Sequence, residues 1–275
     1  MIVAAGAFVS SSGRTISLRD DVDRMLAATK LYRPADCADV VDAVKRAPTS
    51  AGAGTATRIE VTNETTAAAT RRLARDGCHS VACLNFASAR TPGGGYRSGA
   101  RAQEEDLARK SALAAYLESA VARPYYEAKR AHASLLYTDH LVWTPAVPFF
   151  RDDDLALVDD VWHAHVVTSP APNRGALLAR IDSHAPLDVE DAERSIVATL
   201  RRRAEHVVAV LAKEGAKNVV LGAWGCGVFK NDPVVVADVL AQVLERYRAF
   251  ERVVFAVFDP SSSQPSLRAF TERFA

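Results

Sequence analysis

The apolar positions of the chain switch between the spacing typical of helices and the continuous runs typical of buried strands. The continuous runs predict strands at residues 56–61, 80–86, 158–168, 217–223 and 253–258. The helical spacing predicts helices at residues 66–75, about 103–122, about 189–214 and 266–274. Strands that alternate with helices in this way predict an α/β domain with helices on both faces of a sheet.

The N-terminal part of the chain has a helical pattern and no linker composition. An apolar stripe predicts a helical segment over about residues 17–47, and it is formed by Val22, Met25, Leu26 and Leu31. A break of small residues follows at 48–54. We therefore interpret residues 1–275 as a single domain, with about residues 1–50 as a helical extension packed on its flank.

Prolines mark two further boundaries. Residues 135–150 are predicted to contain two short extended runs around Pro145 and Pro148. Pro233 is expected at the first position of a helix, because proline lacks the N–H that this position leaves unpaired. Asn231 or Asp232 is then expected to cap that helix with its side chain.

Composition excludes several classes of protein. Hydrophobic residues make up 49% of the chain, enough for a substantial core, and 34 basic residues balance 33 acidic ones without a polybasic tract. Duplex nucleic acid and membranes are therefore not expected as main partners. The four cysteines form no CxxC pair, and neither a signal peptide nor a transmembrane stretch is recognisable. We expect a reducing, cytoplasmic setting.

Two glycine-rich loops carry the first candidate chemistry. They follow the predicted strands 80–86 and 217–223, and their residues are Gly93, Gly94 and Gly95, then Gly225, Cys226, Gly227, Val228 and Phe229. Bare backbone lets a phosphate or sugar approach closely, and loops of this kind place ligands at the carboxyl ends of strands. Neither loop matches the Walker A or the dinucleotide pattern. The alternative is that the glycines only form tight turns.

Gln103, Glu104 and Glu105 open the predicted helix 103–122, seven residues after the triglycine. Adjacent helical residues point about 100° apart, so the two carboxylates should have different roles. The alternative is that acidic residues simply favour a first helical turn, by about 0.3–1 kcal/mol each. The helix dipole also lowers a carboxylate pKa, so a general acid here needs burial or a neighbouring charge to raise it. Beside such loops, the pair predicts an enzyme that binds a phosphorylated sugar and protonates one of its bonds.

Other polar groups are interpreted as structural. His163 and His165 share one face of a predicted strand, but the sequence offers no third metal ligand near them. The acidic run at 152–154 is typical of a solvated surface loop. No Gly-x-Ser-x-Gly elbow is present, which argues against a serine hydrolase. We therefore expect no metal ion and no other cofactor.

Several of these motifs together resemble one family. Residues 84–89 (Leu-Asn-Phe-Ala-Ser-Ala), the triglycine and the Gln-Glu-Glu run resemble the signature of poly(ADP-ribose) glycohydrolases, specifically the compact bacterial type. Residues 222–229 (Gly-Ala-Trp-Gly-Cys-Gly-Val-Phe) are similar to that family's diphosphate loop. The similarity extends over nearly the whole chain. It implies a macrodomain-like, three-layer α/β/α fold with a mixed central sheet and an N-terminal helical extension.

The resemblance also implies roles for individual residues. Glu105 corresponds to the acid that cleaves the ribose–ribose O-glycosidic bond of poly(ADP-ribose), and Glu104 to a carboxylate that holds a ribose hydroxyl. Asn85 and the triglycine would contact the distal ribose, the second glycine loop the diphosphate, and two aromatic residues the terminal unit. The implied substrate contacts are Asn85, Gly93, Gly94, Gly95, Gln103, Gly225, Cys226, Gly227, Val228, Phe229 and Phe258.

The implied ligands are poly(ADP-ribose) and ADP-ribose, and the implied partners are ADP-ribosylated proteins. The compact form implies a mainly exo-acting enzyme that takes units from the free end of the polymer. The resemblance further implies a monomer and a role in the response to DNA damage. Animal-type members carry Asp-Phe-Ala-Asn where this chain has Asn-Phe-Ala-Ser at 85–88. Two alternatives stay open. One is a non-catalytic ADP-ribose reader, which would have no use for the glutamate pair, and the other is a hydrolase of mono-ADP-ribosylated substrates.

Overall fold

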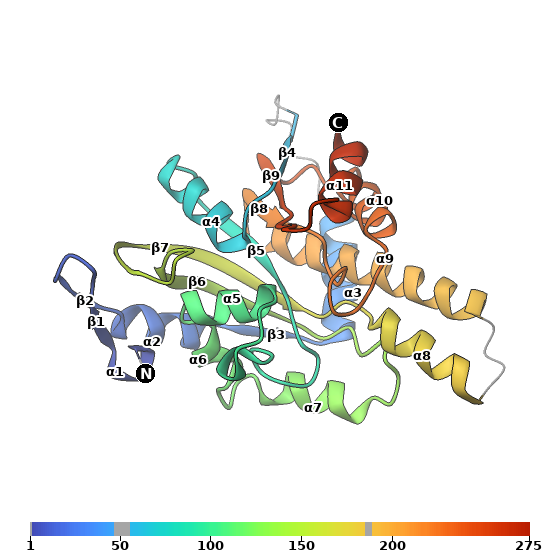
Figure 1. Ribbon diagram of the computed structural model, residues 1–275, viewed down its shortest axis with the longest axis horizontal. Helices are drawn as coiled ribbons and strands as arrows, with labels where there is room; N and C mark the ends of the chain where they lie inside the picture. The colour runs from blue at the N-terminus through green and yellow to red at the C-terminus, as the bar shows by residue number, and fades with distance from the viewer. Residues whose placement is uncertain (1, 47–55, 185–188) are drawn as a thin grey trace.

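The computed structural model describes residues 2–46, 56–184 and 189–275, so the small-residue break expected at 48–54 lies outside the described residues. The described residues form a two-stranded sheet of β1 (Ala7–Val9) and β2 (Thr15–Ser17), and a central seven-stranded sheet (Figure 1). In spatial order the central strands are β3 (Lys30–Tyr32), β6 (Leu141–Arg151), β7 (Leu157–Ser169), β5 (Val81–Phe86), β8 (Asn218–Leu221), β9 (Arg252–Ala256) and β4 (Arg58–Thr62).

The central sheet is mixed in direction. β6 runs antiparallel to its neighbours β3 and β7, whereas β7, β5, β8, β9 and β4 are parallel to one another. β5 lies inside the sheet and is buried along nearly its whole length, as expected for a continuous apolar run in a parallel sheet. Its side chains alternate between two separate cores, with Leu84 in one and Cys83 in the other.

Helices cover both faces of this sheet (Figure 1). The core that contains Leu84 is completed by α3 (Pro34–Arg46), α9 (Val189–Lys213), α10 (Pro233–Leu244) and α11 (Pro265–Phe274). The core that contains Cys83 is completed by α2 (Arg19–Ala28), α4 (Thr66–Arg75), α5 (Gln103–Lys110), α6 (Leu113–Leu117) and α7 (Arg123–Ala131). The predicted α/β architecture with helices on both faces is therefore confirmed. No helix of the described residues is long and apolar enough to cross a membrane.

Two elements match the sequence pattern closely. α4 has the predicted bounds, and its N-terminus is capped by Thr65, whose hydroxyl accepts a hydrogen bond from the N–H of Ala68 at 3.0 Å. α10 begins at Pro233, and Asp232 is its N-cap, since its carboxylate accepts from the N–H of Val234 at 2.8 Å. Asn231, the other candidate cap, has a different role described below.

The N-terminal segment differs from its prediction. Residues 17–47 are not one helical stretch, because β3 separates α2 from α3 and pairs with β6. Leu31, counted in the helical stripe, pairs with Val142 across this edge of the sheet. A three-residue strand is too short to show a period of its own, which is why the helical spacing on either side concealed it.

The middle of the chain also differs in detail. The helix expected at 103–122 is interrupted after α5, because Ser111 turns to extended backbone and bridges to Phe149, while Ala112 donates its N–H to the carbonyl of Pro148 at 3.0 Å. The two runs expected at 135–150 are one strand, β6, whose register shifts beside Pro145 because proline has no N–H for the ladder. α7 and α8 (Arg174–His184) were not predicted.

The strand order brings both glycine loops to one edge of the sheet. β5 and β8 are parallel neighbours, and their carboxyl ends lead into residues 87–102 (the first loop) and 222–232 (the second loop). β9 also ends here, and a Cβ added to Gly222 would lie 2.5 Å from the carbonyl oxygen of Ala256 and 3.2 Å from the ring of Phe86. The ends of β5, β8 and β9 therefore meet at Gly222, which has no room for a side chain.

The cap of α4 gives a prediction for stability. Thr65→Ala removes an acceptor that satisfies a terminal N–H, so the free energy of unfolding should fall by about 1 kcal/mol. Thr271→Ala is the matched control, because Thr271 is an exposed residue of α11 whose hydroxyl bonds back to the carbonyl of Leu267 in the same helix. Urea unfolding of both variants measures the difference. Equal changes in the free energy of unfolding of the two variants would contradict the assignment of Thr65 as the cap.

Candidate active site

Glu104 is buried between the end of β5 and the first loop. Its side chain is 3% exposed, and Oε2 accepts a hydrogen bond from the backbone N–H of Ser88 at 2.7 Å. Oε1 accepts from Nδ2 of Asn85 at 3.3 Å. Asn85 is itself fully buried on β5, and its Nδ2 also lies 3.4 Å from the hydroxyl of Thr168 on β7. Strand side chains and loop backbone together fix this carboxyl group.

Glu105 is held by different donors. Its Oε1 accepts from the backbone N–H of Gly95 at 2.9 Å, and its Oε2 accepts from that of Ala102 at 3.2 Å. The second bond reaches back to the residue before the helix and satisfies a terminal N–H. The first bond ties the carboxyl group, which is 9% exposed, to the triglycine. The adjacent carboxyl groups thus face separate sets of donors, as the 100° offset predicted.

The triglycine is required by this arrangement of carboxyl groups. Gly93 and Gly94 both have left-handed backbone, with φ of +67° and +58°. A Cβ added to Gly94 would lie 2.2 Å from Oε1 of Glu105 and 3.3 Å from Oε2 of Glu104. Only a residue without a side chain lets the loop pass this close to both carboxyl groups, so the glycines do more than form a turn.

Burial raises the pKa of Glu104 to about 8, and the charge of Glu105 adds to the shift although the hydrogen bonds from Ser88 and Asn85 oppose it. The carboxyl group is therefore protonated at neutral pH. Burial and the like charge of Glu105, the two factors expected to offset the helix dipole, both act on Glu104.

Gln103 connects three elements. Its Oε1 accepts from the N–H of Phe86 at 2.8 Å, while its Nε2 donates to the carbonyl of Leu84 at 2.7 Å and to the hydroxyl of Thr66 at 3.1 Å. The acceptor and both donors of the amide are thus used within the protein. This geometry differs from the substrate contact expected for Gln103, and it positions the start of α5 against the end of β5.

The second loop is folded around a buried asparagine. Asn231 Nδ2 donates to the carbonyls of Pro172 at 3.0 Å and Gly225 at 3.2 Å, and its backbone N–H donates to Gly225 at 3.0 Å. Gly225 has φ of +75°, and a Cβ there would lie 2.5 Å from both Asn231 Nδ2 and the side chain of Ala171. The loop therefore closes tightly on the segment that follows β7.

The tip of the second loop offers free backbone donors. The N–H groups of Gly227, Val228 and Phe229 have no hydrogen-bond acceptor within the described part of the chain. A Cβ added to Gly227 would meet nothing within 4 Å, so this side of the loop is open. Successive free N–H groups ahead of a helix N-terminus form an anion-binding arrangement. The thiol of Cys226 lies 4.0 Å from the carbonyl of Trp224, and burial raises its pKa.

Apolar side chains stand around this edge of the sheet. Val228 is 78% exposed, and Phe258, two residues after the end of β9, is 61% exposed. The ring of Phe229 turns inward and lies 6.2 Å from the ring of Tyr137, at an angle of 45°. Large exposed apolar groups at the end of a parallel sheet are typical of ligand sites. The structure thus brings every predicted site residue to one edge of the sheet.

The other candidates lie in structural surroundings. His163 pairs with Asp21 at 3.3 Å, and His165 stacks on Trp143 and accepts from the N–H of Ala146. In the acidic run, Asp152 accepts from backbone N–H groups of its own turn, and Asp153 pairs with Lys110. Within residues 2–46, 56–184 and 189–275, no group of three or more acidic, His or Cys side chains forms a metal site.

Sequence reasoning missed several contributors to the site. Ser88 acts through its backbone N–H, which no side-chain pattern reveals. Thr168 and Tyr137 approach the site only through pairing of β7 and the packing of a loop. Asn231 was weighed only as a helix cap, although asparagine beside a glycine loop is typical of turns held by side-chain hydrogen bonds.

Comparisons with known proteins agree on one family. The model of the microbial-type PARG catalytic domain matches residues 1–152. The structure of poly(ADP-ribose) glycohydrolase from Thermomonospora curvata is 41% identical, with a TM-score of 0.87, covering 99% of this chain and 95% of that chain. The Deinococcus radiodurans enzyme in complex with ADP-ribose is 43% identical, with a TM-score of 0.82, covering 92% and 96%. A search of curated proteins found no match.

The close approach at Gly94 gives a prediction for activity. Gly94→Ala should displace the carboxyl group of Glu105 and lower kcat by about 100-fold, since an error of an ångström at the reacting groups has effects of this size. Gly99→Ala is the control, because Gly99 has the same left-handed backbone, with φ of +88°, and open space around it. Equal kcat values for the two variants would refute the claim that the close approach of Gly94 positions the carboxyl group of Glu105.

The raised pKa of Glu104 gives a prediction for stability against pH. The folded chain binds this proton more tightly than the unfolded chain, whose pKa is near 4.5, so the stabilisation is complete below 4.5 and is lost as the pH rises to about 8. The melting temperature of the wild type should therefore fall between these values relative to that of Glu104→Gln. If the melting temperatures of the two proteins change in parallel with pH across this range, the raised pKa of Glu104 is contradicted.

Proposed function

The chain belongs to the microbial-type poly(ADP-ribose) glycohydrolases, and from this premise we propose that it hydrolyses the ribose–ribose bond of poly(ADP-ribose) and releases ADP-ribose. One observation supports this most directly. A buried glutamate pair, in which burial raises the pKa of Glu104, lies against a triglycine loop, and a loop with free N–H groups follows the neighbouring strand. The first arrangement suits acid chemistry on a sugar, and the second suits a diphosphate.

We propose the following placement of the terminal unit. The diphosphate lies on the N–H groups of residues 227–229, where backbone donors and the start of α10 favour negative charge. The distal ribose lies over the triglycine, with a hydroxyl held by Glu104. Asn85 supports this placement, because its buried Oδ1 has no hydrogen-bond partner in the described residues and can accept from a ribose hydroxyl.

In this placement Glu105 is the general acid. It transfers its proton to the departing ribose hydroxyl oxygen as the bond from the anomeric carbon breaks. The oxocarbenium-like carbon is then attacked by water, whose proton returns to the Glu105 carboxylate. Hydrogen bonds from Gly95 and Ala102 fix the direction in which the proton is delivered.

The exposed apolar side chains beside the site support hydrolysis from the free end of the polymer. Phe258 and Val228 lie beside the proposed diphosphate position and can enclose a terminal unit.

The N-terminal segment supports a single domain over residues 1–275, because β3 is an edge strand of the same sheet that carries the site. ADP-ribosylated proteins are proposed as partners because they carry the polymer.

The test follows the release of free ADP-ribose from defined poly(ADP-ribose). We expect release by the wild type, a loss of about 10²–10⁴-fold in Glu105→Gln, and ADP-ribose affinity within a few-fold of the wild type by calorimetry. Glu118→Gln is the matched control, since Glu118 is a more exposed glutamate that pairs with Arg97 on the surface.

The outcomes separate the alternatives. Near-normal release by Glu105→Gln would overturn the acid assignment. A wild type that binds ADP-ribose without releasing it from polymer would be a reader, unless it releases ADP-ribose from a mono-ADP-ribosylated protein in a parallel assay. That second result would show that the enzyme acts on mono-ADP-ribosylated substrates.

A further inference from the structure

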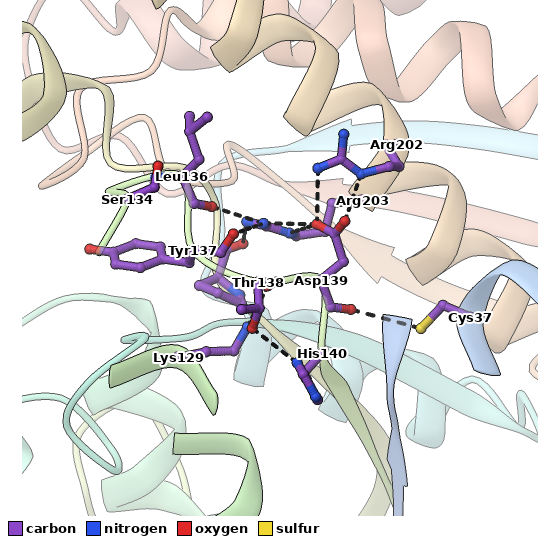
Figure 2. Close-up of polar contacts among 11 residues, drawn as sticks. Cys37, Lys129, Ser134, Leu136, Tyr137, Thr138, Asp139, His140, Arg202 and Arg203 are labelled. Carbon is purple, nitrogen blue, oxygen red and sulfur yellow. Dashed lines mark hydrogen bonds and ion pairs between the residues drawn. The ribbon is translucent and has the colours of Figure 1, made fainter. Parts of the chain in front are cut away.

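Arg203 of α9 is fully buried, and its guanidinium is surrounded by main-chain oxygen atoms. Nη1 donates to the carbonyl of Pro170 at 2.7 Å, and Nη2 donates to those of Leu136 at 2.9 Å and Tyr137 at 3.4 Å. Its charge is balanced by Asp139, which accepts from Nε at 3.0 Å and from Nη2 at 2.9 Å (Figure 2). One side chain thus joins the end of β7 to residues 134–140, which we call the 134–140 segment.

The 134–140 segment is held from both sides by buried basic side chains. Lys129 of α7, also fully buried, donates to the carbonyl of Thr138 at 2.8 Å (Figure 2). The carbonyls of residues 136, 137 and 138 therefore all accept from buried basic side chains of two different helices. Tyr137 has left-handed backbone, with φ of +61°, which is unusual for an aromatic residue and persists only where the surroundings impose it.

A continuous series of contacts leads from Arg203 to the second loop. The N–H of Asn173 donates to the carbonyl of Leu135 at 3.0 Å, and Asn173 Nδ2 lies 3.4 Å from the hydroxyl of Tyr137. Pro172 then accepts from Asn231, which closes the second loop, and Gly175 donates its N–H to the carbonyl of Phe229 at 2.9 Å.

The rings make a second connection, since Tyr137 lies against Phe229. The second loop therefore rests on residues 170–175, which rest on the 134–140 segment. Arg203 anchors both supports at once. Asp139 stays ionised to balance it, because Arg202 and Arg203 outweigh the effect of burial and lower its pKa.

We propose that Arg203 is a positioning residue for the second loop: by fixing the carbonyls of Leu136, Tyr137 and Pro170, it sets the affinity for the diphosphate of ADP-ribose without contacting it. This inference rests on the proposed function, in which residues 227–229 bind the diphosphate. Free N–H groups bind an anion well only when they are already aimed at it, so the supports of the loop control affinity. The glutamate pair is held separately by the first loop and β5, so the chemical step should be preserved.

The variant that tests this is Arg203→Lys, which keeps a buried cation but cannot reach three carbonyls and a carboxylate at once. We expect the Kd for ADP-ribose and the KM for polymer to rise about tenfold while kcat stays within about threefold. Arg202→Lys is the matched control. It makes the same change at the next residue, whose hydrogen bonds within the described residues go to Asp139.

Tyr137→Asn is a second, independent variant. Asparagine tolerates left-handed backbone, so the contacts of Arg203 can persist while the ring against Phe229 is lost. It should also raise the Kd for ADP-ribose, by less than Arg203→Lys. This variant decides the matter if Arg203→Lys fails to fold, and unchanged affinity would then overturn the inference.

Three further results would count against it. Arg203→Lys with wild-type Kd, or with a fall in kcat at constant Kd, would show a purely structural role. Equal effects of the changes at 202 and 203 would show that the charge balance at Asp139, and not the carbonyl contacts, is what matters. A wild type that does not bind ADP-ribose would refute the proposed function, and this inference with it.

Discussion

The structure of the site depends on one constraint: two adjacent glutamates are buried at the end of a parallel strand, and each needs hydrogen-bond donors there. A buried carboxyl group without partners is strongly unfavourable. The first loop supplies backbone N–H groups from Ser88 and Gly95, and it can approach this closely because Gly94 has no side chain. Burial then raises the pKa of Glu104 to about 8, and the charge of the adjacent Glu105 adds to the shift.

The two halves of the site have different main supports. The glutamate pair is held by β5, Gln103 and the first loop, whereas the second loop rests on residues 170–175 and the 134–140 segment. The parallel pairing of β5 with β8 sets the halves side by side. Buried basic side chains hold main-chain carbonyls in the second half, and the contacts of Arg203 join segments far apart in the sequence that turn sequences alone do not bring together.

The sequence alone predicted the features that depend on local pattern or on a family signature. α4, the start of α10 at Pro233, the layered fold, the glutamate pair and both glycine loops are of this kind. Contacts between distant residues were not predictable, such as Arg203 with Leu136, which are 67 positions apart. β3 was missed because three residues show no period, and the hydrogen bonds of Gln103 to the backbone of β5 were missed because no side-chain pattern reveals backbone partners.

The most direct test of the account is a crystal structure of this protein with ADP-ribose bound. The account predicts that diphosphate oxygens accept hydrogen bonds from the N–H groups of residues 227–229, and that the distal ribose lies over the triglycine with Glu104 bonded to one of its hydroxyls. A diphosphate bound away from the second loop, or a distal ribose out of reach of both Glu104 and Glu105, would contradict it.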